Sequence, residues 1–117
     1  QYNAVSNVRI DAALNNAVCV QITNGKGQVL DKVRCVMNSV SGAKGVVVNA
    51  TLNHSQIDIH CVGGVAEMEF GEGGGIGTRN RIIIRTDGTT STIANLPTTW
   101  GTGNYVEVNG AQVTPGS

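Results

Sequence analysis

The stretch YNAVSNVRIDAALNNAVCVQI, residues 2–22, decides the expected fold. Several of its apolar positions recur at the spacing of one face of an α-helix. They are Ile10, Ala13, Leu14, Ala17 and Val18. From residue 18 onward apolar and polar residues alternate, which is the period of a β-strand. The pattern predicts a helix over residues 2–17 that runs directly into a strand at 18–22.

This predicted helix has no start signal. Residues 2–4 read Tyr-Asn-Ala, and no capping box precedes the apolar stripe. A helix without a cap is expected where a longer helix has been cut. We therefore expect a single domain over residues 1–117, in which residues 1–17 are the C-terminal half of a long N-terminal helix. Residues 18–117 would form a β-rich head.

The rest of the chain is typical of short strands separated by turns. Asn-Gly or Asp-Gly pairs at 24–25, 87–88 and 109–110 favour the positive φ angles of tight hairpins. The expected strands span residues 29–37, 46–52, 56–61, 65–70, 81–86, 89–96, 105–108 and 111–113. The sequence has no convincing internal repeat. We therefore predict an α+β fold, with the N-terminal helix packed on antiparallel β-sheet.

Composition argues against two classes of partner. The chain has 117 residues, eight basic and eight acidic, and a formal net charge of zero. Proteins that bind nucleic acid or anionic membranes usually carry a basic excess. No run approaches the roughly 20 apolar residues that span a bilayer. We therefore expect no nucleic acid, and membrane attachment only through a helix upstream of this chain.

Three cysteines leave at least one thiol unpaired. Strand alternation places Cys35 and Cys61 on core-facing sides, whereas Cys19 falls on the side of Gln21. Periodicity therefore favours a Cys35–Cys61 disulfide, worth about 3 kcal/mol by loop entropy. The alternative is three thiols in the core, where free cysteine is common. The Thr/Ser/Asn/Gly-rich, Lys-poor composition favours an extracytoplasmic protein and therefore a disulfide.

The glycine run GEGGGIG, residues 71–77, invites a phosphate-loop interpretation. It matches neither GxGxxG nor GxxxxGK, and a strand is expected after it where a phosphate loop needs a helix. We interpret it as a flexible hairpin loop.

No residue cluster predicts catalysis or metal binding. His54, Asp58, His60 and Cys61 match no common zinc spacing, and His60 falls on the opposite strand face from Cys61. Ser55 beside His54 is mere adjacency, without a GxSxG elbow. We expect no catalytic residue, no cofactor and no metal.

Three arginines, Arg79, Arg81 and Arg85, lie close together in the sequence. They form a candidate anion or DNA patch, although three arginines supply few phosphate contacts. The favoured interpretation is that they keep a hydrophobic strand soluble.

Three stretches carry a resemblance to a known family. They are a helix-to-strand passage at residues 10–20, an apolar-x-Phe strand with a glycine turn at 68–73, and a glycine-containing β element at 105–113. In these features the chain resembles type IV pilin-like proteins, particularly minor pilins and the H-type minor pseudopilins of type II secretion. The resemblance implies a non-enzymatic structural subunit of a pilus or secretion filament.

The resemblance also implies a location and partners. The subunit would be periplasmic or at the cell surface, anchored to the inner membrane, and would contact other pilin or pseudopilin subunits. A Cys19–Cys35 bridge is implied as well, in competition with Cys35–Cys61. Some members bind DNA through a basic C-terminal region, but residues 93–117 contain no Lys or Arg.

A second hypothesis comes from another class of protein. The chain would be a secreted or phage-type β-rich ligand-binding module. Its site would lie on residues 71–77 and 97–103, with Trp100 as the exposed aromatic anchor. A small hydrolase that uses His54 or His60 is the least favoured of the three.

Overall fold

The computed structural model describes residues 3–37, 41–63, 66–86 and 93–115. Within these ranges the chain forms β-strands, turns and loops, and contains no helix. None of these residues therefore belongs to a helix that could cross a membrane. The predicted α+β fold is wrong, and so is the helix predicted over residues 2–17.

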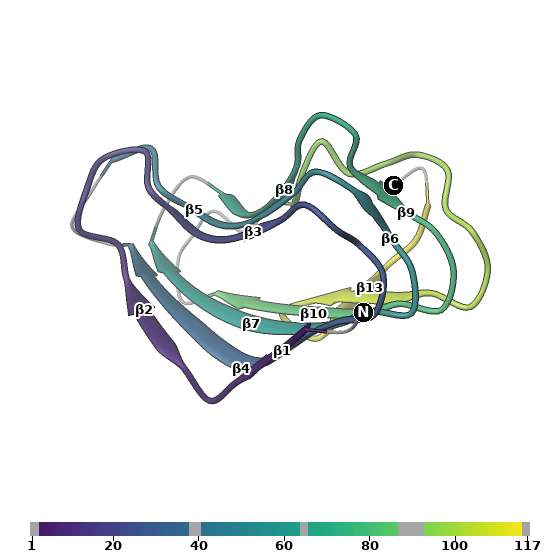
Figure 1. Cartoon of the computed structure of the whole chain (residues 1–117), viewed down its shortest axis with the longest axis horizontal. Coiled ribbons are helices and arrows are strands. Elements are labelled where there is room, and N and C mark those ends of the chain that lie inside the picture. Colours follow the sequence, from purple (N-terminus) through teal and green to yellow (C-terminus); the bar gives the residue numbers. More distant parts are fainter. Residues whose placement is uncertain (1–2, 38–40, 64–65, 87–92, 116–117) are drawn as a thin grey trace.

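The larger sheet holds seven of the described strands (Figure 1). They are β1 (Asn3–Ser6), β2 (Arg9–Asp11), β4 (Gln28–Met37), β7 (Gln56–Gly63), β10 (Arg81–Thr86), β12 (Tyr105–Val108) and β13 (Ala111–Val113). Their order is β1-β4-β7-β10-β12-β13, and β2 also pairs with β4. Every pair is parallel except β12 with β13.

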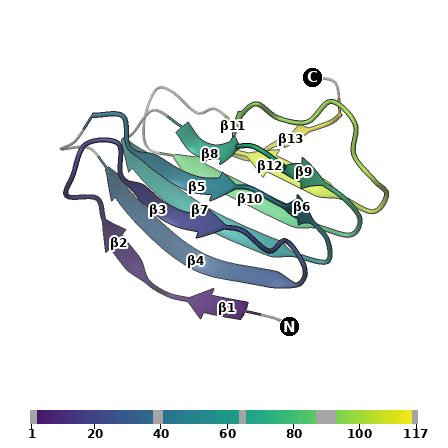
Figure 2. The same ribbon diagram turned by 45° about the horizontal axis from the view of Figure 1, so that its top comes forward.

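A second sheet lies over the first, as Figure 2 shows. It contains β3 (Val18–Ile22), β5 (Lys44–Val48), β8 (Ala66–Phe70) and β11 (Ile93–Ala94), in the order β11-β8-β5-β3. Two short parallel strands, β6 (Thr51–Leu52) and β9 (Gly75–Ile76), link the two sheets at one side. All pairs in this layer are parallel.

The chain therefore winds as a parallel β-solenoid, because each turn visits both sheets and returns one strand further along. Val29 lies opposite Gln56, Gln56 opposite Arg81, and Arg81 opposite Tyr105, so equivalent positions recur once in every coil. The expected antiparallel sheet is wrong for all described pairs except β12 with β13.

The core consists of stacked rows of aliphatic side chains. One row runs through Leu30, Ile57, Ile82 and Val106, and a second through Val33, Ile59, Ile84 and Val108. Ile22, Val48 and Phe70 face them from the second sheet. Each fully buried aliphatic side chain contributes about 1.5–3 kcal/mol. Because equivalent residues stack from coil to coil, the core is continuous through the solenoid.

The N-terminal residues are strand because the edge of β4 offers them backbone partners. Ile10 lies opposite Cys35, and the Ala12 N–H donates to the Val36 carbonyl at 2.9 Å. Asn7 and Asn16 adopt φ angles of 53° and 61°, which interrupt a helix. A helix of about four turns is marginal in isolation, so pairing with the sheet prevails.

The predicted turns had mixed outcomes. The hairpin at 109–110 is confirmed, since it joins β12 to the antiparallel β13. The hairpin at 24–25 is wrong, because this turn connects β3 to β4 in different sheets. The pair at 87–88 lies outside the described residues, as does part of the strand predicted over 89–96.

Candidate functional site

One corner of the solenoid carries a row of buried polar side chains, which we call the polar ladder. Its members lie where strands of the larger sheet begin, either as the first residue of β4 or directly before β7, β10 and β12, and they occupy equivalent positions in successive coils. They are Gln28, Ser55, Asn80 and Asn104. The first three are 8%, 2% and 2% exposed.

Hydrogen bonds join each ladder residue to the next coil. The Gln28 N–H donates to Ser55 Oγ at 3.0 Å, and the Ser55 N–H to Asn80 Oδ1 at 2.9 Å. Asn104 Oδ1 accepts from the Asn80 N–H at 3.0 Å and from Asn80 Nδ2 at 2.9 Å. Buried polar groups are stabilising only when they are satisfied in this way.

The sequence contains a signal for this ladder that our sequence analysis missed. Ser55-Gln56-Ile57, Asn80-Arg81-Ile82 and Asn104-Tyr105-Val106 share a small polar residue two positions before an apolar one. Each of these triplets lies one coil after the previous one, in the register of the paired strands. The repeat is short and degenerate, so it becomes clear only when the register is known.

The residue before each ladder position adopts the left-handed conformation. We call these four residues the turn row: Gly27 (φ 65°), His54 (53°), Arg79 (57°) and Gly103 (77°). The backbone N–H groups of the first three bond to the next corner: Gly27 to the Asn53 carbonyl, His54 to the Thr78 carbonyl and Arg79 to the Thr102 carbonyl, each at 2.9 Å. Glycine adopts this conformation freely, whereas other residues do so at a cost of about 1–2 kcal/mol.

An open groove of about 350 Å³ lies beside the turn row. We call it the basic groove, after the side chains that line it: His54, Arg79, Arg81, Gln56 and Tyr105. His54, Arg79 and Arg81 are exposed. Among the described residues, no carboxylate lines the groove or forms an ion pair with these three side chains. The groove therefore combines positive charge, an aromatic ring and amide groups.

Two contacts orient the aromatic side of the groove. The Arg81 guanidinium lies over the Tyr105 ring, 5.4 Å from its centroid. The Tyr105 hydroxyl donates to Glu107 Oε1 at 2.7 Å. This hydrogen bond to a carboxylate favours the protonated phenol and raises the pKa of Tyr105. Tyr105 is therefore a neutral aromatic surface at physiological pH.

The three arginines singled out in the sequence do not act together. Arg79 and Arg81 line the basic groove, whereas Arg85 forms an ion pair with Asp58 on the neighbouring strand. Arg9 is similarly paired with Asp11 at 3.0 Å. These exposed pairs are neutralised locally and contribute little to stability.

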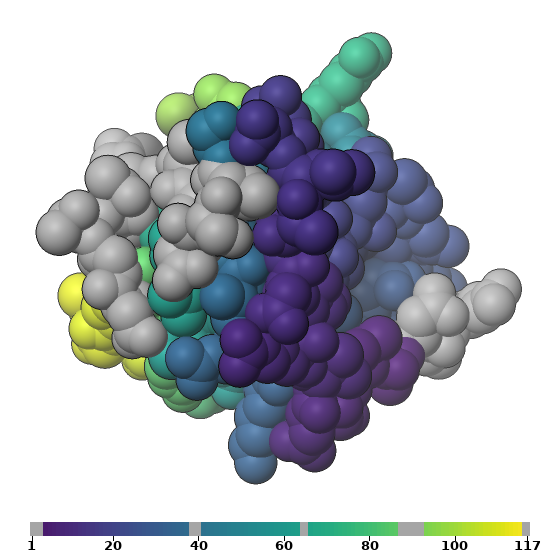
Figure 3. Space-filling model, turned by 90° about the vertical axis from the view of Figure 1, so that its left-hand side faces the viewer, coloured from purple at the N-terminus to yellow at the C-terminus, as the bar shows by residue number. Residues whose placement is uncertain are grey.

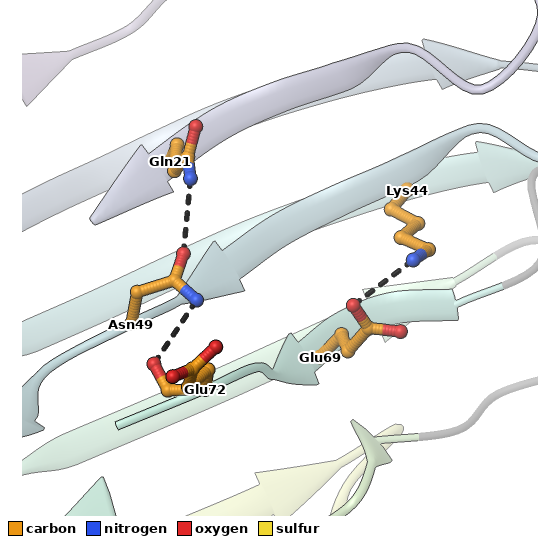
Figure 4. Close-up of polar contacts among 5 residues, drawn as sticks. All are labelled: Gln21, Lys44, Asn49, Glu69 and Glu72. Carbon is orange, nitrogen blue, oxygen red and sulfur yellow. Dashed lines mark hydrogen bonds and ion pairs between the residues drawn. The ribbon is translucent and has the colours of Figure 1, made fainter. Parts of the chain in front are cut away.

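The outer face of the second sheet is also neutralised (Figure 4). Lys44 Nζ lies 2.9 Å from Glu69 Oε2 across β5 and β8. Gln21 Nε2 donates to Asn49 Oδ1 at 3.0 Å, and Asn49 Nδ2 donates to the Glu72 carbonyl at 3.2 Å. These contacts hold coils together and, among the described residues, leave no comparable group of converging cations on this face.

The histidine cluster considered in the sequence is split between environments. Cys61 is buried in the core, whereas His60 is half-buried on the outer face, as strand alternation predicted. Ser55 belongs to the polar ladder, and its hydroxyl donates to the Gly25 carbonyl at 2.8 Å. In the described part of the chain, no three His, Cys, Asp or Glu side chains are placed to hold a metal ion.

The loops of the second hypothesis lie next to each other. The Gly101 N–H donates to the Ile76 carbonyl at 3.1 Å, which joins residues 97–103 to the glycine run. The predicted hairpin loop at 71–77 is wrong, because this run contains β9 and pairs in parallel with β6. Trp100 is half-buried against the core, and its Nε1–H donates to the Pro97 carbonyl at 2.8 Å.

The cysteines are three free thiols in this structure. Cys35 and Cys61 are fully buried and lie opposite each other on β4 and β7, so their predicted core-facing orientation is confirmed. Cys19 is half-buried on β3 and packs against the core.

Comparisons of the chain with protein-family models, with curated proteins and with solved structures found no match. The class of protein therefore follows from the architecture alone, which is a parallel β-solenoid with a basic groove at one corner.

Proposed function

We propose that this chain is a non-enzymatic ligand-binding module that holds an anionic group of its ligand in the basic groove. The observation that carries this proposal is the composition of the turn row. Glycine occupies the left-handed position in two of the four coils, whereas His54 and Arg79 occupy it in adjacent coils. Backbone strain that places particular side chains is a mark of functional sites.

The neighbouring groups fit an anion. Arg79 and Arg81 come from one coil and His54 from the coil before it, and neighbouring strands are separated by about 4.8 Å. Guanidinium groups bind carboxylate, sulfate and phosphate through paired hydrogen bonds. Tyr105 adds a flat apolar surface, and Gln56 adds donors and acceptors. This combination suits a sugar ring that carries an acidic group.

The other functional hypotheses are supported by fewer observations. The filament-subunit prediction depended on a helix that the structure replaces with β1 and β2. Its cellular location and its pilin partners stay predictions, and we do not build on them. The loop site around Trp100 also stays a prediction, although that side chain is half-buried and its indole N–H is bonded within the loop.

The proposal is tested with three polysaccharide probes. Heparin carries sulfates, hyaluronate carries carboxylates, and dextran is neutral. We expect binding of at least one anionic probe, weakened by salt, and none of dextran. Arg79→Ala and Arg81→Ala should each weaken that binding by about tenfold, because each removes a charge-assisted hydrogen bond.

Arg34→Ala is the matched control. Arg34 is exposed on the same sheet but lies outside the groove, and its removal changes the net charge by the same amount. Equal losses from Arg34→Ala and Arg79→Ala would mean that binding is non-specific. A loss confined to Trp100→Ala would move the site to the 97–103 loop. Binding of no anionic probe would contradict the proposal.

A further inference from the structure

The three thiols form a continuous group that crosses the core from one sheet to the other. The Cys35 side chain is within hydrogen-bonding distance of both Cys19 and Cys61. Cys35 lies on β4 and Cys61 opposite it on β7, whereas Cys19 approaches from β3 in the second sheet. Cys35 is therefore the shared neighbour of the other two thiols.

The two neighbours of Cys35 differ in how well they are placed for a disulfide. Cys35 and Cys61 occupy adjacent parallel strands, so their Cβ atoms point the same way and stay about 4.8 Å apart. Disulfides need Cβ atoms about 3.8 Å apart. Cys19 approaches Cys35 from the other sheet, so the spacing of a parallel strand pair does not hold these two side chains apart. The cross-sheet pair is the better candidate for a bond.

The environment of Cys61 also keeps it out of the reaction. Its Sγ lies 3.8 Å from the Glu67 carbonyl oxygen, to which the thiol donates. A Cβ at Gly45 would lie 2.7 Å from this sulfur, so the absence of a side chain there makes room for Cys61. Cys61 is fully buried, which shields it from an oxidant.

Cys19 is the accessible member of the group. It lies on β3, which is at one edge of the second sheet among the described strands, and it is half-buried. Figure 3 shows the first coil, in purple, running over the surface on this side of the molecule. The hydrogen bond from Cys35 lowers the pKa of Cys19, against the opposing effects of burial and of Asp11. The thiolate is the reactive form of cysteine.

We propose that Cys19 is a redox-reactive thiol and that Cys35 resolves it, closing a reversible Cys19–Cys35 disulfide between β3 and β4 with a small-molecule disulfide as the oxidant. This site is separate from the basic groove and does not depend on the ligand proposed there. Cys61 remains a thiol throughout.

The reaction balances in two steps of thiol–disulfide exchange. The Cys19 thiolate attacks one sulfur of oxidised glutathione, forms a mixed disulfide and releases one glutathione thiolate. The Cys35 sulfur then attacks Cys19 Sγ and releases the second glutathione, while the Cys35 proton passes to a released thiolate. Two protein thiols are oxidised, and one glutathione disulfide is reduced to two thiols.

The test treats the folded full chain with excess oxidised glutathione, counts free thiols after denaturation and maps linked peptides by mass spectrometry. We expect two of the three thiols to disappear and the linked peptides to contain Cys19 and Cys35. Dithiothreitol should restore all three. Retention of three thiols, or a bridge between Cys35 and Cys61, would overturn the proposal.

Two variants assign the roles. Cys35→Ala should stop at the mixed disulfide of Cys19 with glutathione, because no resolving thiol remains. Cys61→Ala is the matched control, since it removes the other buried thiol beside Cys35, and the Cys19–Cys35 bridge should still form. Failure of Cys61→Ala to form the bridge would contradict the assignment. The peptide map of the unaltered chain decides the outcome even where a variant does not fold.

Discussion

The polar ladder and the turn row lie one residue apart at every corner, yet they meet opposite requirements. Ser55 and Asn80 point inward and are each 2% exposed. His54 and Arg79, directly before them, point outward with positive φ angles. In the described part of the chain, no buried side-chain nitrogen or oxygen lacks a hydrogen-bond partner. The ladder therefore holds the coils together, and the turn row directs the His54 and Arg79 side chains into the basic groove.

This difference shows how a solenoid separates stability from function. The side chain of an inward residue is constrained by the coils on both sides of it, whereas at the same corner the outward residue is constrained mainly through its backbone, by its φ angle and its N–H hydrogen bond. The variants below change one row and leave the other intact, in order of decreasing expected effect.

The largest effect is expected from Asn80→Ala. This change removes the side chain that accepts from the Ser55 N–H and donates to the Leu52 carbonyl at 2.8 Å. The buried Ser55 N–H is then left without a partner, whereas the Leu52 carbonyl keeps the Gly77 N–H as its donor. We expect a loss of about 2–4 kcal/mol in the free energy of unfolding, measured by urea denaturation. Gln112→Ala, exposed on β13, should change it by no more than about 0.5 kcal/mol. Similar effects from both would refute a structural role for the ladder.

Gly103→Ala should have an intermediate effect. The left-handed φ of 77° disfavours alanine, and the new Cβ would lie 3.1 Å from Arg79 Cγ. We expect a loss of about 1–2 kcal/mol in unfolding free energy and weaker binding of the anionic probe, because Arg79 must shift. Gly110→Ala is the control, since its φ is 85° but nothing lies within 4 Å of the added Cβ. Gly110→Ala should lower the free energy of unfolding through the same backbone strain, but it should leave binding of the anionic probe unchanged.

Arg79→Gly should have the smallest effect on stability. Unlike the two previous variants, it should raise the free energy of unfolding. Relief of the left-handed strain outweighs the entropy of the new glycine, so we expect a gain of about 0.5–1 kcal/mol in unfolding free energy. Binding of the anionic probe should fall at the same time.

Lys32→Gly provides the control for this prediction. Lys32 is an exposed cation with a φ of 54°, and it lies at the bulge of β4, outside the groove. Its replacement should stabilise the fold to a similar extent and leave binding unchanged. If Arg79→Gly stabilises the fold without weakening binding, the strain at Arg79 has no functional meaning.

Part of the fold could be predicted because strand signals are local. The strands at 81–86, 105–108 and 111–113 have the predicted bounds. The helix at residues 2–17 was predicted wrongly because Ile10 and Ala12 fit both a helical and an alternating pattern. Only the neighbouring β4, which lies a full coil further along the sequence, distinguishes the two.

The candidate site was harder to predict for the same reason. Arg79 and Arg81 were recognised as a cluster and interpreted as solubilising charges. His54 was considered only with its sequence neighbours, and Tyr105 was not considered as a site residue. They meet because successive coils stack their corners, which a list of local motifs does not reveal.

By itself, the sequence determined where β3, β10, β12 and β13 begin and end, which sides of several strands are apolar, and that a hairpin joins β12 to β13. Alternation and turn propensity act over a few residues, so these features need no partner. Only the tertiary structure decided that the strands pair in parallel, that the N-terminal residues are strand, and that His54, Arg79, Arg81 and Tyr105 share a groove. These outcomes depend on stacking between segments that lie a full coil apart in the sequence, where the buried rows and the polar ladder favour one register over all others.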